Sequence, residues 1–583
     1  MQACKYDKYP AIHVRGVQGT QAWQGWEDIG RELTARLQAV NGRILCVDCY
    51  HGVWEQQVLD SLVMHLKPDH VFCASQAALD RDTVNAMLAY NVTDDRVFGI
   101  LSHHRIEQFF DAERLAKLRE EIAASDGVSL VFGVGAALLC QADVLVYADM
   151  ARWEIQQRFR AGTLANWLND NVDEDPLRKY KRAFFVDWRV LDRHKLGLLP
   201  QIDYLLDTNS APTPKMMTGR IYRSALEQAA AQPFRVMPYF DPGVWGGQWM
   251  KKVCGLDPAQ KNYAWSFDGV PEENSLLIDV AGTVLETPAI NLVLMKPHQL
   301  LGEKGHARFG AEFPIRFDFL DTMGGGNLSL QVHPLTEYIQ NTFGMHYTQD
   351  ESYYILDAAE GEETHVYLGC KTGIDREEFA QALADSQQTG KFDAEKYVNV
   401  IPARKHDHFL IPAGTIHCSG RNCMVLEISA TPFIFTFKLW DWGRLGLDGR
   451  PRPIHLEHGM KNIQFDRDTQ WVQENLVGQV ELIRQEEGIR EERTGLHERE
   501  FIETRRHWFS RPVTHNTQGG VNVLNLIEGE EAVVESPDGS FAPFVVHYAE
   551  TFIIPAAVGA YTIAPHGPSV GKTLATIKAY VRT

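Results

Sequence analysis

The stretch Asn327-Leu-Ser-Leu-Gln-Val-His-Pro334 alternates apolar and polar residues in the manner of a β-strand. Side chains two positions apart on a strand point to the same face. Gln331 and His333 therefore project side by side, so that an amide oxygen lies next to an imidazole. Zinc accepts nitrogen and oxygen donors of this kind. We interpret the stretch as half of a metal site.

Two further donors follow in the chain. Glu351 opens a second strand-like run, and His417 ends the segment Ile411-Pro-Ala-Gly-Thr-Ile-His417. Taken singly, each residue is better explained as exposed polar surface or as a buried, hydrogen-bonded histidine. The donors in order, each with its flanking motif, favour a mixed nitrogen and oxygen site instead. The expected cofactor is Zn²⁺, although iron, manganese or cobalt would accept the same ligands.

Length and composition describe a globular protein of several domains. A chain of 583 residues predicts two to four cores, and the net charge of −19 argues against binding to nucleic acid or to an anionic membrane. No apolar run approaches 18 residues, and the first ten residues have no signal-peptide core. Nine scattered cysteines are not typical of a secreted disulfide framework. The cytoplasm is the expected location.

The order of elements predicts an α/β part followed by a mainly β part. Over residues 1–210, short apolar strands such as Val97 to Leu101 alternate with amphipathic helices, which predicts a parallel sheet. Residues 211–233, with Ser210-Ala-Pro-Thr-Pro214 at their start, are the expected linker, and one helix is expected inside it from Arg220 to Ala231. Residues 234–460 read as a β domain with a helical insertion over 374–386, and residues 461–583 as a second β domain.

Two motifs suggest that the β domains are related barrels. Phe552-Ile-Ile-Pro-Ala-Ala557 echoes Phe409-Leu-Ile-Pro-Ala-Gly414.

From about residue 234 onward the chain also resembles type I mannose-6-phosphate isomerase in a series of landmarks. Besides the metal motifs they are Val244-Trp-Gly-Gly247, Leu300-Leu-Gly302, Phe313 to Asp321, Trp440-Asp-Trp-Gly-Arg444 and Asp448 to His455. The resemblance implies two cupin (jelly-roll) barrels and a zinc-dependent isomerase of carbohydrate metabolism.

The same resemblance assigns roles to single residues. It implies Gln331, His333, Glu351 and His417 as metal ligands, Arg444 as the catalytic arginine, and Ser329, Gln349 and Asp350 as substrate-binding residues. The implied reaction converts mannose 6-phosphate to fructose 6-phosphate through a metal-stabilised enediol. Gln349 and Asp318 stand where the family commonly has lysines, so both a sugar and a sugar phosphate stay open as substrate.

The first 210 residues resemble a uridine-kinase-type P-loop fold faintly, and only in the order of their elements. After the first buried strand the chain reads Asp48-Cys-Tyr-His-Gly-Val-Trp-Glu55, with one glycine and no Lys-Ser/Thr pair. A phosphate loop needs both features. We therefore expect a structural or docking domain, which could bind a protein partner. The alternative function is a non-catalytic sensor, in which the barrel binds metal and sugar and this domain reports occupancy.

Overall fold

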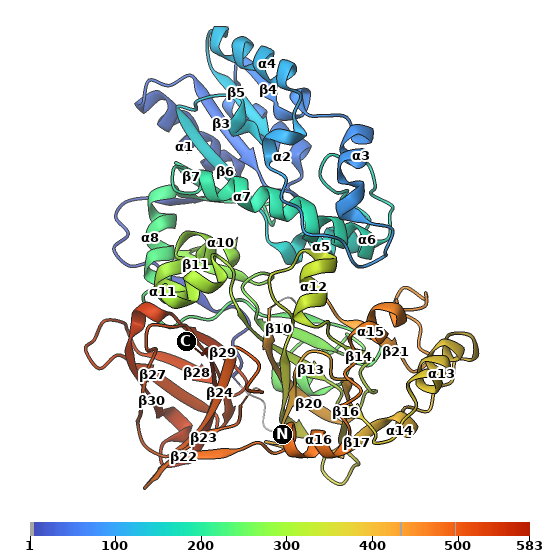
Figure 1. The fold of residues 1–583 in the computed structure, drawn as a ribbon. Helices are drawn as coiled ribbons and strands as arrows, with labels where there is room; N and C mark the ends of the chain where they lie inside the picture. Colours follow the sequence, from blue (N-terminus) through green and yellow to red (C-terminus); the bar gives the residue numbers. More distant parts are fainter. Residues whose placement is uncertain (1–4, 211, 432–433, 496, 583) are drawn as a thin grey trace. The chain divides into compact units, whose positions relative to one another are not determined.

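The computed structural model describes residues 5–210, 212–431, 434–495 and 497–582 (Figure 1). The chain forms two compact units. The barrel unit comprises residues 1–10, 230–271 and 297–583, and the sheet unit comprises residues 11–229 and 272–296.

The sheet unit is built on a seven-stranded sheet with the order β2-β8-β7-β6-β3-β5-β4 (Figure 1). Five consecutive strands, from β7 to the edge strand β4, are parallel, as the alternation of strands and helices predicts. They are β3 (Ile44–Cys49), β4 (His70–Cys73), β5 (Ser129–Gly133), β6 (Val144–Asp149) and β7 (Tyr204–Asp207). The longer helices are α1 (Trp26–Ala39), α2 (Glu55–Leu66), α3 (Arg81–Val92), α4 (Ala112–Ala124), α5 (Arg152–Arg160), α7 (Trp188–Leu198) and α8 (Gly219–Ala229).

Two expectations about this part of the chain differ from the structure. Residues 97–101 are not a strand, because the Ile100 amide donates to the Asn91 carbonyl at the end of α3. A short apolar run does not distinguish a strand from a packed loop. Within the expected linker over 211–233, the predicted helix is present as α8. The preceding residues were not expected to be a strand, but they form β8 (Lys215–Thr218), which pairs with β7 and with β2 (Ala22–Gln24).

A distant segment also belongs to the sheet unit. Residues 272–296 contain β11 (Ser275–Val280) and β12 (Thr283–Pro288), and β11 pairs in parallel with β1 (Ala11–His13). Buried hydrogen bonds attach this segment to α5 and to the end of β6. They are Arg152 Nη1 to Glu272 O at 2.8 Å, Gln156 Nε2 to Glu273 Oε2 at 2.7 Å and Asn291 Nδ2 to Asp149 Oδ2 at 2.7 Å. Only long-range pairing defines this segment, so a local sequence pattern could not reveal it.

The barrel unit contains two β-barrels of two sheets each. The sheets of the first barrel have the orders β18-β15-β20-β13-β10-β9 and β17-β16-β19-β14-β21. Its strands are β9 (Tyr239–Asp241), β10 (Trp265–Gly269), β13 (Ile315–Asp321), β14 (Leu330–Val332), β15 (Glu351–Ala358), β16 (His365–Cys370), β17 (Val398–Pro402), β18 (His408–Ile411), β19 (His417–Ser419), β20 (Cys423–Ala430) and β21 (Phe437–Trp440). The expected helical insertion is α13 (Arg376–Thr389), whose N-cap Asp375 accepts from the Glu378 amide.

The second barrel repeats this topology, except that β21 has no counterpart in it. Its sheets have the orders β29-β26-β31-β24-β23-β22 and β28-β27-β30-β25, so β25 to β31 take the places of β14 to β20. Its strands are β22 (Glu481–Glu486), β23 (Ile489–Arg493), β24 (Ile502–Phe509), β25 (Val513–Asn516), β26 (Asn522–Glu528), β27 (Glu531–Glu535), β28 (Phe544–His547), β29 (Thr551–Ile554), β30 (Ala560–Pro565) and β31 (Leu574–Val581). The echoing motifs lie on β18 and β29, the same edge of each barrel.

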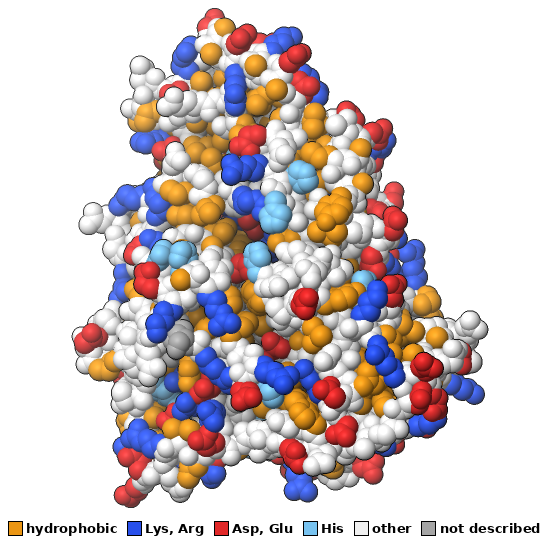
Figure 2. Space-filling model, in the orientation of Figure 1, with side chains coloured by type: hydrophobic (Ala, Val, Ile, Leu, Met, Phe, Trp, Pro, Cys, Tyr) orange, Lys and Arg blue, Asp and Glu red, His pale blue; other side chains and the backbone are white. Residues whose placement is uncertain are grey.

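Charge is dispersed over the visible surface. On the face drawn in Figure 2, acidic and basic side chains are interspersed and form no continuous basic stripe. Within the described part of the chain, no helix has both the length and the apolar character needed to cross a bilayer.

The buried carboxyl of Glu273 makes the stability of the sheet unit depend on pH. Burial raises its pKa to about 7, although Arg152 acts to lower it. The folded state therefore holds this proton more tightly than the unfolded state, and the free energy of unfolding falls as pH rises from about 4.5 to about 7. We expect Glu273→Gln to reduce the loss of stability between about pH 5 and about pH 8, measured by denaturant unfolding.

The exposed Glu113 provides the matched control. Glu113→Gln should keep the pH dependence of the unaltered chain. An equal slope in the Glu273 variant and in the unaltered chain would contradict the assignment.

Candidate metal centre and active site

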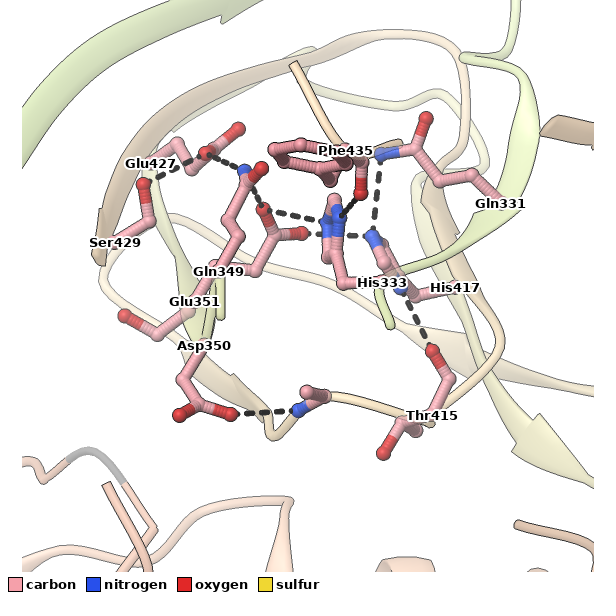
Figure 3. A network of polar contacts seen from close by, with 12 residues as sticks. Gln331, His333, Gln349, Asp350, Glu351, Thr415, His417, Glu427, Ser429 and Phe435 are labelled. Carbon is pink, nitrogen blue, oxygen red and sulfur yellow. Dashed lines mark hydrogen bonds and ion pairs between the residues drawn. The ribbon is translucent and has the colours of Figure 1, made fainter. Parts of the chain in front are cut away.

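Three of the predicted donors converge inside the first barrel (Figure 3). His333 Nε2 lies 3.1 Å from Glu351 Oε2, and His417 Nε2 lies 2.7 Å from Glu351 Oε1. One ligand atom from each residue lies within 4.8 Å of the others, and all three side chains are buried. The spacing is that of a group that could hold one metal ion.

Strand pairing explains this convergence. Gln331 on β14 stands directly opposite His417 on β19, so their side chains share one face. The Gln331 amide nitrogen is 3.2 Å from His417 Nε2, and the carboxamide can present its oxygen in the same direction. Glu351 opens β15 in the facing sheet. The barrel interior therefore collects donors from both of its sheets.

Hydrogen bonds orient the two imidazoles. His333 Nδ1 donates to the Phe435 carbonyl at 3.1 Å, and His417 Nδ1 donates to the Thr415 carbonyl at 2.9 Å. Each ring thereby keeps the lone pair of Nε2 for the space beside Glu351. Backbone carbonyls are common outer partners of metal-binding histidines, so this arrangement suits a metal site.

The donor set fits a divalent cation. Within the described residues, His333 Nε2 and Glu351 Oε1 are buried atoms without a hydrogen-bond partner. A buried carboxylate needs compensating positive charge, and a cation would supply it.

A polar wall continues from Glu351 across the barrel interior. Gln349 Nε2 donates to Glu351 Oε2 at 2.9 Å and to Glu427 Oε1 at 3.2 Å, and Ser429 Oγ donates to Glu427 Oε1 at 2.9 Å (Figure 3). Arg316 forms ion pairs with Glu427 and with Asp318. The acid at position 318, which the sequence placed where lysine is common, is thus neutralised within the wall.

Asp350 directly precedes β15, and its side chain lies on the opposite side of the chain from Glu351. Its Oδ1 accepts from the Ala413 amide at 2.8 Å, and its carboxyl points away from Glu351 (Figure 3). Burial raises its pKa to about 6. Adjacent strand residues point to opposite faces, which explains why Gln349 and Glu351 share the wall while Asp350 supports the loop behind it.

Asp441 engages the predicted residues Arg444 and Ser329. Arg444 Nη2 is 2.6 Å from Asp441 Oδ1, and its Nη1 donates to the Asn327 carbonyl at 2.7 Å. Ser329 Oγ donates to the same Asp441 Oδ1 at 2.8 Å. Arg452 Nη1 also contacts Asp441 Oδ2 at 2.9 Å. Arg444 is therefore tied into a cluster with Asp441.

Lys438 is a further cation near the predicted donors. The sequence alone did not predict that it lies there. It lies on β21 directly opposite Gln331, so its side chain shares the face of the donors. Burial, helped by Arg452, lowers its pKa to about 7. The alternation in Phe437-Lys-Leu-Trp440 was a signal for a strand, but a sequence does not give the register that sets its neighbours.

Hydrogen bonds from Arg467 and a glycine turn hold the loop before His417 in place. Arg467 Nη1 donates to the carbonyls of Pro412 and Ala413 at 2.9 and 2.7 Å and to Thr415 Oγ1 at 2.5 Å. Gly414 has φ +86°, and a Cβ there would lie 2.8 Å from Gln464 Cγ. The motif therefore needs glycine at this turn. Arg467 also holds the side-chain hydroxyl of Thr415, the residue whose carbonyl orients His417.

The second barrel has different residues at the equivalent positions. His515 pairs with Tyr561 as Gln331 pairs with His417, and Asn522 pairs with Ile554 as Glu351 pairs with Ile411. Tyr561 Oη donates to Asn522 Oδ1 at 2.9 Å. Among the residues that the structure describes, the group of potential ligands is confined to the first barrel.

Comparisons with known proteins give one family match and several similar proteins. Residues 25–231 match a family described as a domain of unknown function (DUF8485). The chain is 25% identical over 232 residues to mannose-6-phosphate isomerase of Streptococcus mutans, covering 40% of this chain and 67% of that protein. It is 24% identical over 234 residues to mannose-6-phosphate isomerase ManA of Bacillus subtilis, covering 40% and 68%.

Solved structures that superpose on the chain include mannose-6-phosphate isomerases. The crystal structure of mannose 6-phosphate isomerase from Bacillus subtilis superposes with a TM-score of 0.47 and 17% identity, covering 60% of this chain and all of that one. A phosphomannose isomerase from Salmonella typhimurium gives 0.46 and 14%. From the sequence similarity, the chain is a mannose-phosphate isomerase-like enzyme. These relatives do not favour a non-catalytic sensor.

The bracing role of Arg467 predicts a loss of stability on its removal. Arg467→Met would leave the buried carbonyls of Pro412 and Ala413 without their donor, which costs about 1–3 kcal/mol. Denaturant unfolding of the full chain measures this change. Arg421, which is exposed, provides the control Arg421→Met. Equal stability of the two variants would show that the loop does not depend on Arg467.

Proposed function

We propose that this chain is a metal-dependent aldose–ketose isomerase acting on a sugar phosphate, with mannose 6-phosphate and fructose 6-phosphate as the expected pair. The observation that carries the proposal is the convergence of His333 and His417 on Glu351 within 4.8 Å. The similarity to curated mannose-6-phosphate isomerases supports it. The structure's buried donors without partners support the presence of a cation.

In this proposal Gln331, His333, Glu351 and His417 bind the metal, with Zn²⁺ as the expected ion. When bound, a divalent cation stabilises negative charge that develops on sugar oxygens during aldose–ketose exchange. The chain's own residues supply the rest of the site. Gln349 and Ser429 present fixed hydrogen-bonding groups along the wall.

We propose that Lys438 contacts the substrate. It is the cation that lies opposite a metal ligand, whereas Arg444 is engaged by Asp441 and the Asn327 carbonyl. Because the carboxylate of Asp441 is shared by Ser329, Arg444 and Arg452, this cluster fixes one side of the site. Arg444 then acts as a positioning residue, and the sugar's anionic group lies nearer Lys438.

The direct test is an assay of the purified full chain after loading with Zn²⁺, Mn²⁺ or Co²⁺. Formation of fructose 6-phosphate from mannose 6-phosphate is expected, and a chelator should abolish it. Unphosphorylated mannose is the comparison that defines the substrate class. Metal-loaded protein that turns over neither mannose 6-phosphate nor any other aldose or aldose phosphate would refute the isomerase assignment.

Removal of one proposed ligand should remove metal and activity together. His333→Ala is expected to weaken metal binding by more than the about 10–100-fold that changes in outer partners cost. Metal content by mass spectrometry and turnover measure the two effects. The exposed His346 provides the control His346→Ala. Unchanged metal content in the His333 variant would show that the ion binds elsewhere.

The two candidate cations can be separated by matched substitutions. Lys438→Met should lower kcat/KM by about 10²–10³-fold, the range found when one charge-stabilising donor is removed. Lys438→Arg should restore part of the loss. Arg444→Met should have the smaller effect on kcat and a larger effect on thermal stability. A greater loss of kcat in the Arg444 variant would reverse the two roles and make Arg444 the catalytic arginine.

A further inference from the structure

A second cavity lies in the sheet unit, at the carboxyl ends of its parallel strands. It has a volume of about 230 Å³ and is lined by residues that follow β3, β4 and β5 and by the loop 164–169. In open parallel sheets, ligands bind outside the carboxyl ends of the strands. The volume is below the roughly 300–1,000 Å³ of sites for drug-sized ligands, so it suits a molecule of about monosaccharide size.

His51 contributes a buried acceptor to this cavity. Its side chain lines the cavity and the residue is 4% exposed. Nε2 donates to the Ala165 carbonyl at 3.0 Å, and burial lowers the pKa of the ring, so the neutral ring carries its lone pair on Nδ1. Within the described residues Nδ1 has no hydrogen-bond partner. A ligand that donates a hydrogen bond would satisfy it.

Glu55 contributes a second acceptor. It opens α2, lines the same cavity and has a pKa that burial raises to about 7, although the Val134 backbone acts to lower it. The side-chain amide of Asn166, another lining residue, already donates hydrogen bonds within the protein. Its Nδ2 donates to the Lys179 carbonyl and to Asp187 Oδ2, both at 2.9 Å. The cavity thus offers acceptors and calls for a ligand rich in donors.

The lining disfavours an anionic ligand. Among the described residues that line the cavity there is neither lysine nor arginine. The nearby cations are engaged by backbone carbonyls: Arg158 Nη1 donates to Gly52 O at 2.7 Å, and Lys179 Nζ to Leu164 O at 3.1 Å. A phosphate group would therefore be buried beside Glu55 without compensation. Phe110 and Trp167 add aromatic surface, against which the C–H face of a sugar ring can pack.

We propose that this cavity binds an unphosphorylated monosaccharide, whose hydroxyl groups donate to His51 and Glu55. A sugar carries several donors on one rigid ring and so can serve two separate acceptors, whereas a simple amine offers one donor group. This site belongs to the sheet unit and does not depend on the reaction proposed for the first barrel.

The test is calorimetric titration of the full chain with D-mannose, D-glucose and D-fructose. The His333→Ala background is used, and a metal chelator is present, so that metal-dependent binding in the first barrel does not contribute. We expect at least one sugar to bind saturably at concentrations up to about 20 mM, which are high enough to detect a site with a millimolar Kd. Ser75 is exposed and lines the cavity, so Ser75→Phe should fill it without altering the core and weaken binding at least about tenfold.

Two further variants identify the contacts. His51→Ala should weaken binding about tenfold, whereas Glu55→Gln keeps an acceptor and should change the affinity by less than about tenfold. The exposed Glu113→Gln is the matched control and should bind like its parent. Thermal unfolding of each variant confirms that it is folded.

Three results would overturn the proposal. One is the absence of saturable binding of all three sugars. Another is binding that Ser75→Phe leaves unchanged, which would place the sugar elsewhere. The third is tighter binding of ethanolamine than of any sugar, lost in Glu55→Gln, which would make the cavity a site for an organic cation.

Discussion

The burial of the Glu351 carboxylate between two imidazoles is the interaction on which the first barrel depends. A carboxylate removed from water needs compensating charge and hydrogen bonds. His333, which follows β14, and His417 on β19 approach it, and Gln349 donates to it from the residues before β15. The barrel's two sheets must therefore keep their register for the site to exist. A metal ion fits this arrangement because donor atoms remain without partners at its centre.

Much of this site was predictable because strand periodicity is local. Gln331 and His333 share a face by their spacing alone, and the motifs before Glu351 and His417 placed two more donors. Periodicity also explains the position of Asp350, which follows Gln349 and so points to the opposite face. Lys438 was not placed, because its nearness to Gln331 depends on the pairing of β21 with β14, which no local pattern encodes.

The same distinction holds for the fold. The alternation of strands and helices predicted the parallel sheet, and the echo between β18 and β29 pointed to two barrels that share one strand order. The sequence did not predict that residues 272–296 belong to the sheet unit. Their position depends on the pairing of β11 with β1 and on buried hydrogen bonds from Arg152 and Gln156, which are long-range contacts. The strand β8 was also not predicted, because it lies where we expected a linker.

The two barrels share a topology but differ in the side chains at the equivalent positions. At positions equivalent to Gln331, Glu351 and His417, the second barrel has His515, Asn522 and Tyr561, and the last two bond to each other. The neutral pair Tyr561 and Asn522 satisfies itself, whereas the set around Glu351 keeps donor atoms without partners.

Anomalous diffraction from crystals of the full chain, recorded on both sides of the absorption edge of the bound metal, tests the central claim most directly. The account predicts a single strong peak in the first barrel, bonded to His333, Glu351, His417 and the Gln331 side chain. Crystals grown with the metal that show no peak between these residues, or a peak held by other ligands, would contradict it.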